Sequence, residues 1–175
     1  KDGVLFSKDT KTLIGCPPAL SYSFNKLPKE TETIGVFAFV CNKYIKEINI
    51  PETVTKIQMN AFRACPNLTS VFLPTSATEI QGDTFSFCPS LTDVKLSNKV
   101  AAIGPSAFAY CDSLKKFSIP DSVTYLGWNP FEGSGCIEVE DNVYYVGKWC
   151  VGGDKNRLTK LGLRDGTVGD AETSS

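Results

Sequence analysis

I-G-P-S-A-F-A-Y-C-D-S-L-K-K-F-S-I-P-D-S-V, residues Ile103–Val123, recurs in variant form on both sides of itself at a fixed interval. A phenylalanine and an aliphatic residue each return every 23 residues. The phenylalanines are Phe39, Phe62, Phe85, Phe108 and Phe131, and the aliphatic residues are Ile34, Ile57, Ile80, Ile103 and Leu126. Self-similarity at such a period indicates a solenoid, in which each repeat buries its apolar face against its neighbours.

The composition indicates one globular domain that does not bind nucleic acid. The chain has 175 residues, of which 42% are hydrophobic, enough to bury a single core. Its 18 basic and 19 acidic residues leave no basic stripe for a phosphate backbone. No apolar run reaches the roughly 18–20 residues of a membrane span, and the first residues lack a signal-peptide pattern. A start at Lys1 rather than Met indicates a fragment or a mature form.

Each repeat is expected to contain two extended segments and one compact corner. In L-T-S-V-F-L-P, residues 68–74, the alternation of apolar and polar positions predicts a short strand. Equivalent strands are predicted at residues 45–51, 91–97 and 114–120, and a proline ends three of the four. A second extended piece follows, as at residues 54–57. The A-F-x-x-C stretch after it is short enough for one turn of 3₁₀ or α-helix with its phenylalanine inward.

The cysteines follow the same repeat. Cys65, Cys88 and Cys111 each stand three residues after a repeat phenylalanine, while Cys41 and Cys136 are displaced from that position by one and two residues. They could form disulfides, bind a metal or pack as small buried thiols. Equivalent side chains run parallel, so three in a row cannot all pair, which favours buried thiols. No C-x-x-C pair and no histidine occur, so neither a zinc site nor any other cofactor is predicted.

The pattern A-F-x-x-C-x-x-L-x-x-I-x-I-P-x-x-V-x-x-I-G across residues 34–126 resembles the BspA-like leucine-rich repeats. The resemblance implies a β-rich α/β solenoid with 23-residue coils and β-hairpin modules at both ends. Residues 2–18 resemble the hairpin that often interrupts such arrays, and residues 141–153 look like a second copy. The last coil departs from the pattern, with Pro130 in place of alanine and Ser134 in place of cysteine. The asparagine ladder of ordinary leucine-rich repeats is missing, and cysteine is expected in its place.

A single leucine-rich-repeat domain over residues 1–175 is therefore expected. It would comprise an N-terminal hairpin (1–21), repeats (22–136), a second hairpin (137–157) and a truncated repeat (158–175). A degenerate coil is expected to begin near Tyr22. The last segment restarts the repeat but stops before any A-F-x-x-C, which favours an array cut within a repeat over a capped end.

Outward positions of the stacked strands form the predicted binding face. The residues are Glu47, Asn49, Ser70, Phe72, Asp93, Lys95, Lys116 and Ser118. Leucine-rich repeats usually bind on this face. Phe72 is an aromatic side chain where the alternation predicts exposure, and it either contacts a ligand or is an ordinary exposed apolar residue. Asp93 and Lys116 are expected to form a cross-strand ion pair.

A second row of variable residues, Ala64, Phe87 and Tyr110, follows each repeat phenylalanine by two positions. It could be an aromatic platform for a sugar or partner, or it could pack against the adjacent turn. Trp128 and Trp149 are expected to pack at the junction with the second hairpin rather than to form binding subsites.

Catalysis is not predicted. Glu47 and Asp93 would stand roughly 10 Å apart on an open face, where nothing raises a carboxyl pKa or excludes water. Without histidine the chain cannot form a Ser-His or Cys-His nucleophile.

The resemblance implies a function, because BspA-like proteins are chiefly surface proteins with roles in adhesion and coaggregation. The expected function is a non-catalytic recognition or adhesion module, extracellular or at the cell surface, that binds a host or neighbouring-cell protein or glycan. The alternative is a structural spacer that displays another domain and binds nothing itself. The residues do not determine the ligand or the oligomeric state.

Overall fold

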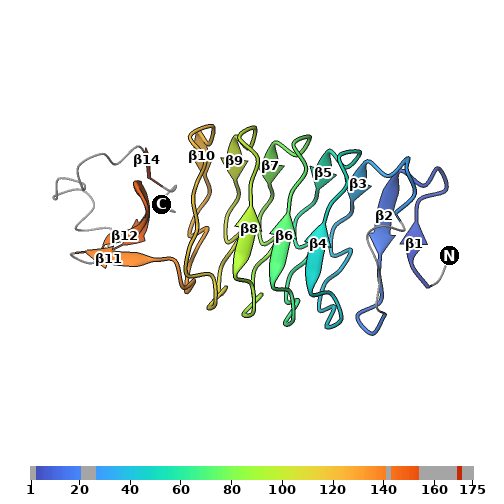
Figure 1. The fold of residues 1–175 in the computed structure, drawn as a ribbon, viewed down its shortest axis with the longest axis horizontal. Helices are drawn as coiled ribbons and strands as arrows, with labels where there is room; N and C mark the ends of the chain where they lie inside the picture. Colours follow the sequence, from blue (N-terminus) through green and yellow to red (C-terminus); the bar gives the residue numbers. More distant parts are fainter. Residues whose placement is uncertain (1–2, 21–26, 141–142, 154–168, 171–175) are drawn as a thin grey trace.

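The computed structural model describes residues 3–20, 27–140, 143–153 and 169–170. Figure 1 shows short strands stacked along the long axis of the molecule, with the N-terminus at one end of the stack. All regular elements of the described residues are strands, and none of these residues forms a helix. The start of the coil expected near Tyr22 and nearly all of the truncated repeat over 158–175 fall outside the described residues.

One column of strands confirms the predicted in-register stacking over three coils. Strands β4 (Glu47–Asn49), β6 (Ser70–Phe72) and β8 (Asp93–Lys95) pair in parallel, and equivalent residues of successive repeats lie opposite one another. Ile48 and Val71 point inward and are fully buried. The 23-residue period therefore sets the strand register.

A second column lies beside the first (Figure 1). It contains β3 (Thr33–Ile34), β5 (Lys56–Ile57), β7 (Glu79–Ile80), β9 (Ala102–Ile103) and β10 (Tyr125–Leu126). Strand β3 pairs in parallel with β5, and β9 pairs in parallel with both β7 and β10. The second residue of each strand is the repeat aliphatic residue, and it is at most 2% exposed.

The repeat phenylalanines form the centre of the core. All five are fully buried, and neighbouring rings stack with centroids 5.1–5.5 Å apart and nearly parallel planes. The predicted inward orientation of this column is confirmed. Each ring contacts the equivalent ring of the next coil, so the core is continuous along the stack.

The prediction of a helical turn at A-F-x-x-C is wrong. Each such corner contains two residues with positive φ, for example Asp83 at 54° and Phe87 at 58°, whereas a helix requires φ near −63°. Alternate amides bond to the next coil, as the Phe85 amide does to the Ala107 carbonyl at 2.8 Å, and the amides between them bond within the corner, as Ser86 does to Asp83 at 3.2 Å. The described chain is thus an all-β solenoid rather than an α/β one. Asparagine or aspartate at several of these positions tolerates the left-handed conformation.

The two ends carry antiparallel strands. At the start, β1 (Leu5–Phe6) pairs antiparallel with β2 (Thr12–Gly15), which pairs in parallel with β3 and so continues the second column. At the other end, β11 (Glu138–Glu140), β12 (Val143–Val146) and β13 (Trp149–Gly153) form an antiparallel sheet, and β14 (Gly169–Asp170) joins β13 in parallel.

The strand predicted over residues 114–120 does not form. Its inward residue, Phe117, stands where the preceding coils have Ile48, Val71 and Val94. The larger ring packs against Phe108, with ring centroids 5.0 Å apart. We attribute the loss of pairing with β8 to this ring, because a side chain bulkier than its column holds the backbone away from the neighbouring strand.

Candidate binding surfaces

The predicted binding face consists of two rows of side chains across β4, β6 and β8. One row is Glu47, Ser70 and Asp93, and the other is Asn49, Phe72 and Lys95. The four charged or amide side chains are exposed, while Ser70 and Phe72 are half-buried. Six of the eight predicted site residues are therefore brought together in the expected register.

Phe72 is less exposed than the alternation predicts. The Lys95 ammonium lies 4.9 Å from the centroid of the Phe72 ring, a distance at which a cation is attracted to an aromatic face. Lys95 thus covers part of the one aromatic side chain on this face. A partner that stacks on Phe72 must displace Lys95 or bind both side chains together.

Lys116 and Ser118 lie apart from this grid. Both are exposed, but they belong to the segment that leaves the strand ladder at Phe117. The ion pair expected between Asp93 and Lys116 does not occur among the pairs of the described residues, which are Lys11–Glu32, Arg63–Asp83 and Lys148–Asp121. The predicted face thus ends at β8.

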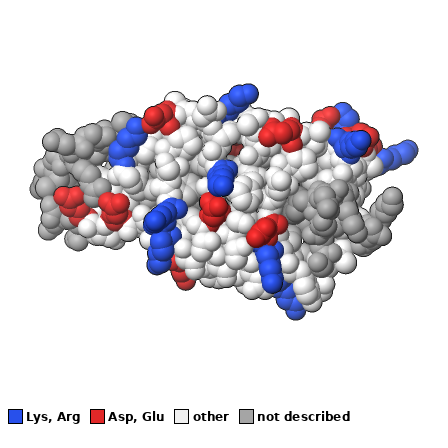
Figure 2. All heavy atoms as spheres, in the orientation of Figure 1, with Lys and Arg blue, Asp and Glu red and all other residues white. Residues whose placement is uncertain are grey.

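Charges of both signs are spread over the surface. On the face drawn in Figure 2, acidic and basic side chains are intermixed and form no stripe of one sign. In the described part of the chain no cluster of histidine, cysteine or acidic residues could hold a metal ion. No helix there is long and apolar enough to cross a membrane.

A second exposed patch lies at the corners of the coils. The rings of Phe87 and Tyr110 stack with centroids 4.7 Å apart, and about 40% of each side chain is exposed. The Arg63 guanidinium lies 5.1 Å from the Phe87 centroid. The Tyr110 hydroxyl bonds to the Glu132 carboxylate, which raises the pKa of the phenol. The sequence pattern singled out the two rings but not Arg63 and Glu132. Arg63 directly precedes Ala64 of that row, and Glu132 precedes Gly133, the equivalent position one coil after Tyr110.

The column of cysteines stabilises the coils. The Sγ atoms of Cys65, Cys88 and Cys111 donate to carbonyls of the preceding coil at 3.1, 3.3 and 3.2 Å, and the Ser134 hydroxyl makes the equivalent bond. Asn42 occupies this register in the first complete coil and is fully buried. The asparagine position is therefore retained once, at the start of the array, which the sequence interpretation missed.

All seven cysteines are free thiols, and only Cys41 is exposed. Burial raises the pKa of Cys111 from 9.0 to about 12 and that of Cys16 to about 11. We expect a thiol-specific reagent at neutral pH to label Cys41 quickly in the native chain and the other six only slowly. Mass spectrometry of the labelled protein checks this. The Cys111 and Cys16 thiols ionise near 9.0 when unfolded and at higher pH when folded, so raising the pH from about 9 to 12 lowers the free energy of unfolding and should speed labelling of these two cysteines. Rapid labelling of Cys88 at neutral pH would contradict the expected burial.

The two tryptophans differ. Trp128, expected to pack at the junction, is 46% exposed, whereas Trp149 is 6% exposed and packs at the junction as predicted. Trp149 lies at the start of β13.

Strands that stack at a 23-residue interval around columns of isoleucine, leucine and phenylalanine define a leucine-rich-repeat solenoid. The chain belongs to the family of the BspA type leucine rich repeat region, which matches residues 20–152 in six copies.

Several solved structures have this fold. A leucine-rich repeat protein from Bacteroides ovatus is 32% identical, with a TM-score of 0.58 over 73% of this chain and 36% of that chain. The pneumococcal vaccine antigen PcpA is 27% identical, with a TM-score of 0.52 over 73% of this chain and 42% of that chain. A leucine rich cell surface protein from Faecalibacterium prausnitzii is 22% identical, with a TM-score of 0.52 over 82% of this chain and 56% of that chain, a likeness of fold alone. This chain thus spans 36–56% of the length of these proteins. No curated protein matches it.

Proposed function

We propose that this chain is a non-catalytic recognition module, extracellular or at the cell surface, that binds a host or neighbouring-cell protein or glycan through the face of β4, β6 and β8. The observation that carries the proposal is the in-register grid on these strands. Asn49, Phe72 and Lys95 present an amide, an aromatic ring and a cation in one line.

The rigidity of the grid supports recognition. Strand spacing places equivalent side chains of neighbouring coils roughly 5 Å apart, so a partner meets groups already held in position. A preorganised surface loses little conformational entropy on binding. Mixed polar groups around one partly covered aromatic ring suit a protein or glycan surface better than nucleic acid or lipid.

The names of two similar proteins support the location. One is described as a cell surface protein and the other as a vaccine antigen.

The spacer alternative is favoured by the modest exposure of Phe72, because a display array needs no accessible aromatic side chain.

Binding of the chain to an array of host matrix proteins and glycans tests the proposal. We expect Phe72→Ala and Asp93→Lys each to weaken binding about tenfold or more, as loss of a central interface contact does. Phe87→Ala is the matched control, because it removes an exposed phenylalanine from a corner of the coil and should leave this binding unchanged.

Thermal melting shows whether each variant remains folded. Asp93 is exposed, so Asp93→Lys tests the face even if Phe72→Ala lowers stability. If the folded parent binds nothing on the array, the spacer is the better account. If both folded variants bind as the parent does, the strand face is not the binding site and the proposal is wrong.

A further inference from the structure

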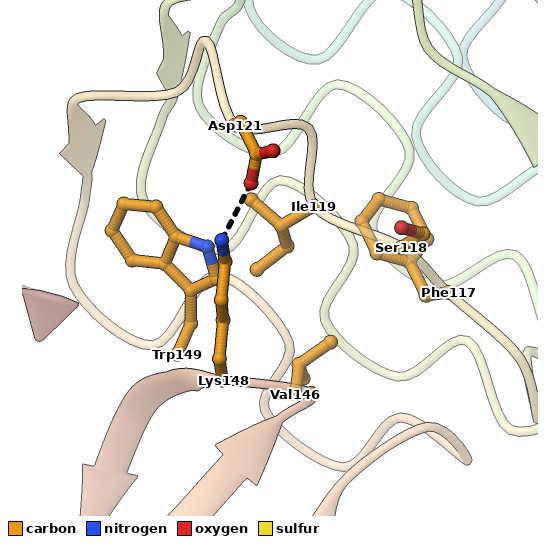
Figure 3. A pocket seen from close by; sticks show the side chains of 8 residues that line it. Phe117, Ser118, Ile119, Asp121, Val146, Lys148 and Trp149 are labelled. Atoms are coloured by element: carbon orange, nitrogen blue, oxygen red, sulfur yellow. Dashed lines mark hydrogen bonds and ion pairs between the residues drawn. The ribbon is translucent and has the colours of Figure 1, made fainter. Parts of the chain in front are cut away.

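A pocket lies where the last coil meets the antiparallel sheet. Its volume is about 300 Å³, and Figure 3 shows the side chains that line it. One wall comes from residues 117–121 of the coil, and the other from residues 146–149, at the turn between β12 and β13. The volume is at the lower end of the range for small-molecule sites.

The pocket exists because the chain leaves the solenoid after Cys136. Strand β11 pairs with β12 instead of stacking on the last coil, and the turn after β12 returns over residues 117–121. An ion pair between Lys148 Nζ and Asp121 Oδ1 at 2.5 Å joins the two walls (Figure 3). Two backbones that do not pair thus enclose a space between them.

The indole nitrogen of Trp149 is the unusual group in this pocket. Trp149 is 6% exposed, and its Nε1 is the one buried side-chain nitrogen or oxygen without a hydrogen-bond partner among the described residues. Indole N–H is a donor only, and buried donors are nearly always paired. Figure 3 shows the nitrogen edge of the ring turned toward Ile119 and the benzene edge turned away from it. The Trp149 N–H therefore lacks a hydrogen-bond acceptor within the described residues.

We propose that this pocket binds one neutral pyranose unit, such as the terminal residue of a glycan. A ring hydroxyl accepts the Trp149 N–H bond, and the apolar face of the sugar packs against Phe117, Ile119 and Val146. The Asp121 carboxylate at the rim accepts a bond from another hydroxyl. Aromatic and aliphatic walls with a few convergent polar groups are the usual composition of such sites.

The charges of the lining favour a neutral ligand over an anion. Asp121 and Lys148 are its charged side chains, and they cancel one another. An anionic oxygen near Trp149 would be attracted by the Lys148 ammonium but repelled by the Asp121 carboxylate. A sugar hydroxyl both donates and accepts, so it satisfies Trp149 and Asp121 together.

We infer that the N–H becomes accessible to a ligand when the ion pair between Lys148 and Asp121 opens. Nε1 has almost no contact with solvent, so a ligand must move a neighbouring group to reach it. The Lys148 and Asp121 side chains are 45% and 87% exposed, and pairs this exposed are weak. Opening the pair therefore costs little free energy.

The indole N–H signals of ¹⁵N-labelled protein test the proposal directly. The chain has two tryptophans, and Trp128 is the internal control because it is exposed and does not line the pocket. Titration with a panel of methyl pyranosides is expected to move the Trp149 signal downfield, as a new hydrogen bond does, and to leave the Trp128 signal in place. Trp149→Phe assigns the signal.

Affinity then separates the indole N–H from the aromatic ring. Trp149→Phe keeps an aromatic side chain but removes the donor, so binding of the best sugar should weaken about tenfold. Trp128→Phe should bind as the parent does. Unchanged affinity in Trp149→Phe would overturn the proposal, as would the absence of any shift across the panel. A shift with sodium acetate but with no pyranoside would assign the pocket to an anion instead.

This pocket is independent of the strand face. Phe72→Ala should leave the Trp149 titration unchanged, and Trp149→Phe should leave protein binding by the strand face unchanged. Either proposal can therefore fail while the other stands.

Discussion

Phe85→Ala is expected to lower the free energy of unfolding by about 3–5 kcal/mol, the usual cost of deleting a large buried aromatic side chain. Phe85 is fully buried between two equivalent rings, with centroids 5.4 and 5.5 Å away. Its loss leaves a cavity in the middle of the column and separates the coils on either side. Because each coil contacts only its neighbours, this loss is expected to affect the whole stack. Urea denaturation followed by circular dichroism measures it.

Phe87→Ala is the control for that experiment. Phe87 is two residues away in the same corner but is 42% exposed, and Ala64 occupies the equivalent left-handed position in the preceding coil. Alanine therefore fits this backbone, and the expected loss is about 1 kcal/mol from the ring contacts. Equal losses in the two variants would show that the buried column does not dominate stability.

Asn42→Ala is expected to cost about 2–4 kcal/mol. The Asn42 amide nitrogen donates to the carbonyls of Pro17 and Leu20 at 3.3 and 3.0 Å, and its oxygen accepts from the amides of Tyr44 and Ile45 at 3.0 and 3.1 Å. Each buried polar group left unpaired costs roughly 1–3 kcal/mol, whereas a group nearer the surface can form a hydrogen bond to water instead. The same urea denaturation measures the loss.

Asn67→Ala is the matched control. Asn67 also bonds a carbonyl of the preceding coil, that of Lys43 at 2.7 Å, but this contact is exposed. Water replaces it after truncation, so a loss below about 1 kcal/mol is expected. If Asn42→Ala is no more harmful than Asn67→Ala, Asn42 does not anchor the first coil.

The proposed recognition surfaces differ in how they arise. The strand face is made by repetition, since each coil adds one rung of exposed side chains to β4, β6 and β8. The Trp149 pocket is made where β11 leaves the stack. An array of this kind can therefore combine an extended surface with a local site beside an antiparallel sheet.

Two features of the surface could not be predicted from the repeat. The position of Lys95 over Phe72 depends on side-chain conformation, which strand alternation does not specify. The pocket joins residues 117–121 to residues 146–149, and the second segment has no counterpart in the repeats. Periodicity predicts contacts only between equivalent positions of successive repeats, so it does not predict contacts with a segment outside them.

The sequence by itself determined the period, the strand register and the buried columns. A stack of equal coils requires an apolar side chain at every inward position, so the five repeat phenylalanines, from Phe39 to Phe131, indicate the stacking of the coils directly. Tertiary structure decided the conformation of the A-F-x-x-C corner, because every second amide of the corner bonds to the next coil rather than within a helical turn. It also decided where the strand face ends. Phe117 is apolar, as the repeat pattern requires, but its ring is larger than the equivalent side chains of the preceding coils, and we attribute the end of the strand pairing to this ring. Hydrogen-bond partners and packing volume are properties of neighbouring coils, and no single repeat contains them.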